Sequence, residues 1–160
     1  MDTVEIRTFE PEDRDWLVAE HRESYARAEG FDDSFGVLVA EILDTFIATH
    51  DPETEHGWMA WQGDKRLGSI FCVRVDAETA KLRLFLLDEA ARGRGLGLKM
   101  LQTCMGFARA KGYRRMVLWT HESHRAAGAL YAKTGWTLMS SKPVVSFGQH
   151  LVEQHWEIAL

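Results

Sequence analysis

The sequence lacks the features that define several classes of protein. It has two cysteines, Cys72 and Cys104, both in apolar surroundings, so we expect buried free thiols and no disulfide framework. No apolar run approaches the length needed to span a membrane, and the N-terminus lacks the basic and apolar regions of a signal peptide. With three prolines, no linker and no repeat, residues 1–160 are predicted to form a single cytoplasmic domain without a membrane partner.

The chain also lacks an excess of basic residues. Its 19 Lys and Arg against 24 Asp and Glu give a net charge of −5, which argues against a nucleic-acid partner. Hydrophobic residues make up 46% of the chain, with six Trp and eight Phe. That composition predicts a folded domain with a proper core.

Apolar periodicity predicts an α/β arrangement. Strands are expected at residues 4–9, 58–61, 67–75, 80–87 and 115–120 and over the alternating tail at 152–160. Helices are expected from Pro11 to about Gly30, from Ser34 through Phe46, from the glycine turn to Lys111, and over residues 124–133.

A glycine-rich turn is the most informative segment. Residues 86–97 read Leu-Leu-Asp-Glu-Ala-Ala-Arg-Gly-Arg-Gly-Leu-Gly and join a strand to a helix, an arrangement suited to binding an anion. A dinucleotide fingerprint would need a third glycine where Leu98 stands. A P-loop would need Ser or Thr after Lys99, where Met100 stands. Both of these nucleotide motifs are excluded.

Two motifs in this order resemble the GNAT acetyltransferases. Arg92-x-x-Gly95-x-Gly97 resembles the acyl-CoA pyrophosphate loop of that family, and residues 127–136, with Leu-Tyr and a Gly-Trp turn, resemble its second signature. The resemblance implies a GNAT fold, with a mixed, mostly antiparallel central sheet of six to seven strands flanked by about four helices. Residues 80–84, 118–120 and 146–151 resemble the acetyltransferase half of bacterial MarR–GNAT fusion proteins. No helix-turn-helix half precedes the first strand, so we expect no DNA-binding role.

The resemblance implies an acetyl-CoA-dependent N-acetyltransferase that passes the acetyl group directly to an amine, on a small molecule or a protein, in a ternary complex. The backbone of the strand at residues 85–87 would pair with the pantetheine arm, and the turn would hold the pyrophosphate. The arginines of the turn can equally be solvated surface charges. The predicted acetyl-CoA-binding residues are Phe85, Leu86, Leu87, Arg92, Gly93, Arg94, Gly95, Leu96, Gly97, Leu98, His124 and Tyr131.

Tyr131 is the candidate catalytic acid. A phenol stays protonated at neutral pH and can donate a proton to a departing thiolate, although a tyrosine on a short helix is commonly a packing residue. His124 stands where the family often has an Asn that contacts CoA, which puts that contact in doubt. His121 or His124 can relay the acceptor's proton or simply cap the helix. The two histidines lack a third ligand, so no metal is expected.

Arg83, Trp119 and Thr120 are the candidate acceptor-binding residues. Arg83 can pair with an acceptor carboxylate or lie at a strand edge facing solvent. The cysteines lie in predicted core elements, and their substitution is expected to leave turnover largely intact. An acyl-CoA sensor or partner-binding module with weak or no catalysis is the alternative function. The alternating C-terminal strand can also pair with a neighbouring copy, which leaves a homodimer open.

Overall fold

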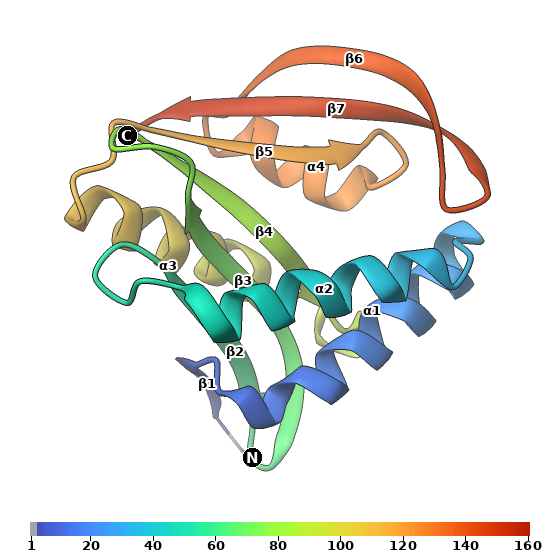
Figure 1. The fold of residues 1–160 in the computed structure, drawn as a ribbon, viewed down its shortest axis with the longest axis horizontal. Helices are drawn as coiled ribbons and strands as arrows, with labels where there is room; N and C mark the ends of the chain where they lie inside the picture. The colour runs from blue at the N-terminus through green and yellow to red at the C-terminus, as the bar shows by residue number, and fades with distance from the viewer. Residues whose placement is uncertain (1–2) are drawn as a thin grey trace. The chain divides into compact units, whose positions relative to one another are not determined.

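The computed structural model describes residues 3–160, which form seven strands and four α-helices (Figure 1). These residues fall into two compact units. The first comprises residues 3–10, 50–116 and 159–160, and the second comprises residues 11–49 and 117–158. Each unit is therefore assembled from segments that are distant in the sequence, and the two are described in turn.

The first unit contains four antiparallel strands in the order β1 (Val4–Thr8), β2 (His56–Gln62), β3 (Lys65–Arg74) and β4 (Thr79–Leu87). The turn Gly63-Asp64 joins β2 to β3, with Gly63 at a φ of +61°. Helix α3 (Leu96–Ala110) packs on β3 and β4. Its apolar stripe is fully buried at Met100, Leu101 and Cys104.

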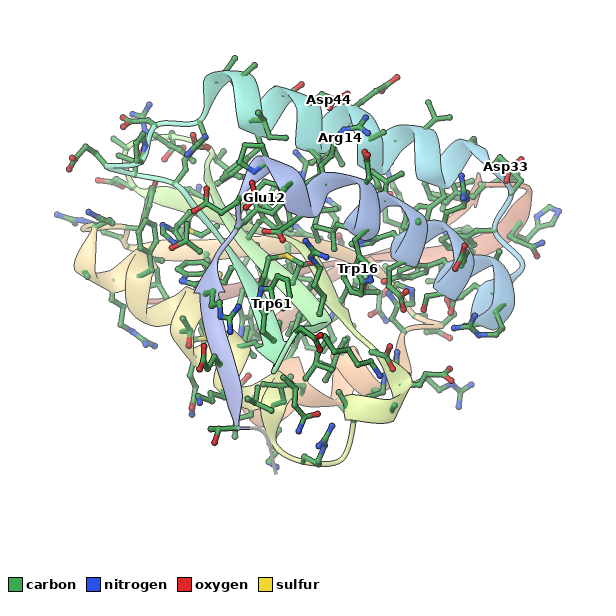
Figure 2. The ribbon with its side chains drawn as sticks, turned by 90° about the horizontal axis from the view of Figure 1, so that it is seen from below. Glu12, Arg14, Trp16, Asp33, Asp44 and Trp61 are labelled. Carbon is green, nitrogen blue, oxygen red and sulfur yellow. The ribbon has the colours of Figure 1, made fainter. Side chains whose placement is uncertain are left out.

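The second unit begins with a short 3-10 turn (Pro11–Asp13) and two long helices, α1 (Arg14–Glu29) and α2 (Ser34–Thr49), which lie side by side in Figure 1. Gly30 ends α1 in the left-handed conformation, with a φ of +71°. The Arg14 guanidinium donates to both carboxylate oxygens of Asp44 at 2.6 and 3.0 Å, and Figure 2 shows these side chains meeting between the helices. This pair ties the start of α1 to α2.

The rest of the second unit comprises β5 (Arg115–His121), α4 (Arg125–Lys133), β6 (Thr137–Ser146) and β7 (Gln149–Ala159), with the first residues of β5 and the last of β7 belonging to the first unit. The strand order is β5-β7-β6, and β6 pairs antiparallel with β7. Nearly all of β6 is exposed.

Strand β6 is an element that the apolar pattern did not locate. Its sequence contains two serines, a lysine and Pro143 and shows no apolar alternation, because neither face of the strand is buried. A proline is tolerated there because β6 pairs with one neighbour, β7, among the described strands. All the helices and strands that were predicted are present, with ends that shift by a few residues.

Candidate functional site

The glycine turn has the geometry of an anion cradle. Asp88 begins it by accepting the N–H of Ala90 at 2.8 Å, and a 3-10 turn follows at Glu89–Ala91. Gly93 and Gly95 adopt φ values of +79° and +75°, which favour glycine. A Cβ at either position would have no atom within 4 Å, so the surface of the turn is open at both glycines.

The start of α3 supplies the hydrogen-bond donors. Gly95 is the N-cap residue, and the Lys99 N–H donates to its carbonyl at 3.1 Å. The N–H groups of residues 95–98 therefore precede the first hydrogen bond within the helix, and the helix dipole adds partial positive charge. The Arg92 Nε donates to the Leu87 carbonyl at 3.3 Å and an Arg94 terminal nitrogen to the Ala90 carbonyl at 3.4 Å, while both side chains stay exposed. This set of donors fits a pyrophosphate.

A β-bulge interrupts β4 just before the turn. Ser69 of β3 pairs with Leu86 and Phe71 pairs with Arg83, so Leu84 and Phe85 together oppose one residue of β3. Leu84 has a φ of +48°, in a region that a leucine rarely occupies. The hydroxyl of the fully buried Ser69 donates to the Leu84 carbonyl at 2.6 Å and holds this conformation. Bulges are common beside active sites, where they change the direction of neighbouring backbone groups.

Sequence reasoning did not find this bulge. No residue type marks a leucine at positive φ, and Ser69 reads as an ordinary residue of a buried strand. Gly68 is the one local signal, because a Cβ there would overlap the Leu86 carbonyl oxygen. The close approach of β3 and β4 at this point requires a glycine.

In the second unit, a cluster of aromatic rings surrounds Phe31, and we call it the Phe31 cluster. Phe31 lies 5.5 Å from Tyr25, 5.1 Å from Phe35, 4.9 Å from Phe147 and 5.9 Å from His121, measured between ring centroids. Its members come from α1, the α1–α2 connection, α2, the end of β5 and the β6–β7 turn. The Asp32 N–H donates to the Phe147 carbonyl at 3.0 Å, which fastens the last of these segments to the α1–α2 connection.

Three of the predicted residues lie on either side of the β5–α4 turn: Thr120 and His121 end β5, and His124 is the N-cap residue of α4. The hydroxyl of Thr120 lies 3.2 Å from His124 Nδ1, and the Glu29 carboxylate lies 3.5 Å from His124 Nε2. Both ring nitrogens of His124 thus face groups of the second unit, and its ring lies 4.7 Å from that of Tyr25. These contacts favour a role in holding the turn, whereas the contact of His124 with acyl-CoA stays a prediction.

His121 lies in a different environment. Its ring is half-buried and lies 5.9 Å from the ring of His124 and 6.4 Å from that of Phe147. Burial lowers the pKa of His121, while the negative charges of Glu29 and Glu153 act in the opposite direction. A histidine with a lowered pKa is neutral at neutral pH and can accept a proton.

Tyr131 lies on α4 in the same unit and is 3% exposed. Its ring lies 5.5 Å from Trp136 and 5.9 Å from Trp156. The ring therefore has a packing function, and donation of a proton by its hydroxyl stays a prediction.

The predicted acceptor-binding residues are divided between the two units. Trp119 is 47% exposed and stacks on His155, with centroids 4.4 Å apart and planes 3° from parallel. Arg83 lies in the first unit on β4, and partial burial lowers its pKa. Among residues 3–160, no Asp or Glu forms an ion pair with Arg83, so this half-buried guanidinium is suited to an external anion.

The cysteines are buried free thiols, as predicted. The Cys104 Sγ lies 3.7 Å from the Phe71 carbonyl oxygen, and burial raises the pKa of this thiol. A raised thiol pKa opposes a role as a nucleophile.

Comparison with known protein families supports both the fold and the two sequence motifs. The model of the acetyltransferase (GNAT) family matches residues 10–136. The chain belongs to this family. The match spans the Phe31 cluster's helices, the glycine turn and the Gly-Trp turn after α4, and it confirms the resemblance drawn from the two motifs.

Several GNAT-type proteins are similar to this chain. The mycothiol acetyltransferase of Geodermatophilus obscurus is 27% identical over 164 residues, covering 98% of this chain and 48% of that protein. N-acetyltransferase 8B of Homo sapiens is 34% identical over 83 residues, covering 49% of this chain and 37% of that protein. The chain thus spans less than half the length of these relatives.

Solved structures confirm the predicted fold class. An N-acetyltransferase from Staphylococcus aureus Mu50 aligns with a TM-score of 0.78 at 19% identity, over 98% of each chain. A GNAT family acetyltransferase from Elizabethkingia anophelis, solved with acetyl-CoA bound, aligns with a TM-score of 0.67 at 16% identity, over 100% of each chain.

Membrane-spanning helices and clustered metal ligands are both absent from residues 3–160. None of the helices found there combines the length and the apolar character needed to cross a membrane. The same part of the chain contains no group of three or more His, Cys, Asp or Glu placed to hold a metal ion.

Proposed function

We propose that this chain is an acetyl-CoA-dependent N-acetyltransferase that transfers the acetyl group directly to an amine. The observation that carries the proposal is the open glycine turn at the N-terminus of α3, in a chain that belongs to the GNAT family. The N–H groups of residues 95–98, with Arg92 and Arg94, would hold the pyrophosphate. The backbone of residues 85–87, which starts within the bulge, would pair with the pantetheine arm.

Acetyl-CoA would supply the acyl group and a thiolate leaving group. In the transfer, the amine nitrogen bonds to the acetyl carbon as the carbon–sulfur bond breaks. His121 accepts the proton that the nitrogen loses, and Tyr131 donates a proton to the sulfur. The proton on His121 then returns to solvent while the phenolate of Tyr131 regains one, so the enzyme ends unchanged.

The acceptor is an amine of a small molecule or a protein. Arg83 would receive an anionic group of the acceptor, and Trp119 and Thr120 would contact the rest of it. The finer likeness to the acetyltransferase half of MarR–GNAT fusions, a cytoplasmic location and a homodimer stay predictions.

An amine-panel screen with acetyl-CoA, read as release of free thiol, tests the proposal. We expect turnover with at least one amine and a marked fall in kcat for Tyr131→Phe with the affinity for CoA kept. Binding of CoA without turnover on any amine would instead favour the acyl-CoA sensor. Turnover that Tyr131→Phe leaves unchanged would remove Tyr131 from the mechanism.

A further inference from the structure

Glu29 occupies a position that local physical chemistry disfavours. It is the last residue of α1, where the helix dipole presents partial negative charge and a carboxylate is unfavourable. Its side chain is 9% exposed, so the carboxylate is also largely removed from water. A charged group kept at such a cost is expected to have partners or a function.

The carboxylate of Glu29 binds the β5–α4 turn. The Ser123 hydroxyl donates to Glu29 Oε2 at 2.8 Å, and His124 Nε2 lies 3.5 Å from the same oxygen. The turn is also held by its backbone, because the His124 N–H donates to the His121 carbonyl at 2.9 Å and the Glu122 N–H to the Val152 carbonyl at 2.8 Å. Glu29 therefore joins the end of α1 to the turn that presents His121.

The negative charge of Glu29 is not offset by a permanent positive charge. Among residues 3–160, its partners are Ser123 and His124, and neither is a lysine or an arginine. Glu153, the other carboxylate that acts on His121, lies 3.7 Å from the ammonium group of Lys142. Of the two carboxylates, Glu29 thus has the less compensated charge.

We infer that Glu29 is a positioning residue for proton acceptance by His121, an inference that rests on the proposed function. Its carboxylate fixes the β5–α4 turn through Ser123 and His124. It also stabilises the imidazolium that His121 becomes when it takes the acceptor's proton. The groups that face His121 are Glu29 from α1, Glu153 from β7, His124 from the same turn, and the uncharged rings of Phe31 and Phe147.

The test compares Glu29→Gln with Glu122→Gln. Glutamine keeps an oxygen that can accept from Ser123 but removes the charge, so the turn is expected to stay in place. Glu122 is an exposed carboxylate next to His121, which makes its substitution a control for the same chemical change on the turn. Melting temperatures of both variants should match that of the parent protein within a few degrees.

Two measurements test the inference. Loss of the Glu29 charge lowers the pKa of His121, so the acidic limb of the kcat/KM profile should move down by about half a pH unit, with kcat reduced about twofold to threefold. An NMR titration of the His121 ring, assigned with His121→Gln, should show the same shift without any need for turnover. Glu122→Gln should leave both readings unchanged.

The outcomes separate the inference from the proposed function. An unchanged His121 titration in Glu29→Gln overturns the role of Glu29 whether or not the parent protein is active. A shifted titration in a protein that acetylates no amine would support the electrostatic coupling and count against the proposed transfer. A fall in activity with an unmoved acidic limb would reduce Glu29 to a structural contact.

Discussion

The glycine turn of the first unit is built from main-chain groups, whereas the Phe31 cluster of the second unit is built from side chains. The turn offers main-chain N–H groups, and its shape depends on φ angles at Gly93 and Gly95, which lie two residues apart. The Phe31 cluster offers side chains from five segments, spread from Tyr25 to Phe147. A site made of backbone groups leaves a contiguous motif in the sequence, whereas a cluster of side chains from distant segments exists only after folding.

The largest effect on stability is expected at Gly68 of the first unit, where there is no space for a side chain. In Gly68→Ala, the new methyl group would overlap the Leu86 carbonyl oxygen, and a backbone atom cannot move aside as a flexible side chain can. We expect a loss of about 3 kcal/mol in the free energy of unfolding, or failure to fold, measured by chemical denaturation.

Gly106→Ala is the matched control. Gly106 lies within α3, and a Cβ there would meet nothing within 4 Å. Alanine should stabilise this helix by about 0.5 to 1 kcal/mol. Equal stabilities for the two variants would show that the close approach of β3 and β4 is not needed by the fold.

The free energy of unfolding is expected to fall in acid because of His21 in the second unit. This histidine is fully buried on α1, and its Nδ1 lies 2.8 Å from the Leu17 carbonyl oxygen. Burial lowers its pKa to about 4, from 6.5 in the unfolded chain. Between these values the unfolded chain binds a proton that the folded protein does not, so stability is complete above pH 6.5 and falls as the pH drops towards 4.

The measurement is the free energy of unfolding at pH 7 and pH 5, for the parent protein and for His21→Gln. The parent should lose roughly 2 kcal/mol more than the variant over this interval. His150→Gln, at an exposed position of β7, should keep the parent's dependence on pH. Identical slopes for the parent and His21→Gln would contradict the lowered pKa.

The same contrast explains how much the sequence could predict. Apolar periodicity, together with helix start and stop signals, located the described helices and every strand except β6, because each of the other elements has a buried or half-buried face. Spacing of glycines located the turn, because positive φ angles select that residue. Neither signal exists for Leu84, whose conformation depends on Ser69 of another strand, or for Glu29, which reads as an ordinary helix end.

His121 and His124 illustrate the remaining difference. Three residues apart in the sequence, they looked equivalent as candidate bases. In the folded protein, His124 Nδ1 lies 3.2 Å from the Thr120 hydroxyl and Nε2 lies 3.5 Å from the Glu29 carboxylate, whereas the His121 ring lies 5.9 Å from that of Phe31. The difference in their surroundings involves Glu29, which is separated from them by more than 90 residues of sequence, and no local pattern carries that information.

The smallest effect is expected at the glycine turn itself. Gly95→Ala must hold a Cβ at a φ of +75°, which costs about 1 kcal/mol, and relief of that strain would rotate the N–H groups at the start of α3. We expect the KM for acetyl-CoA to rise about tenfold with kcat little changed, since the loss falls on binding.

Gly112→Ala provides the control. Gly112 follows the end of α3 and has a φ of +88°, and a Cβ there would also have no atom within 4 Å. The Gly112→Ala variant should lose about as much stability as Gly95→Ala, while its KM for acetyl-CoA stays equal to that of the parent protein. A rise in KM for both variants would mean that strain anywhere around α3 weakens binding. A rise confined to Gly95→Ala would locate the effect in the backbone donors of the turn.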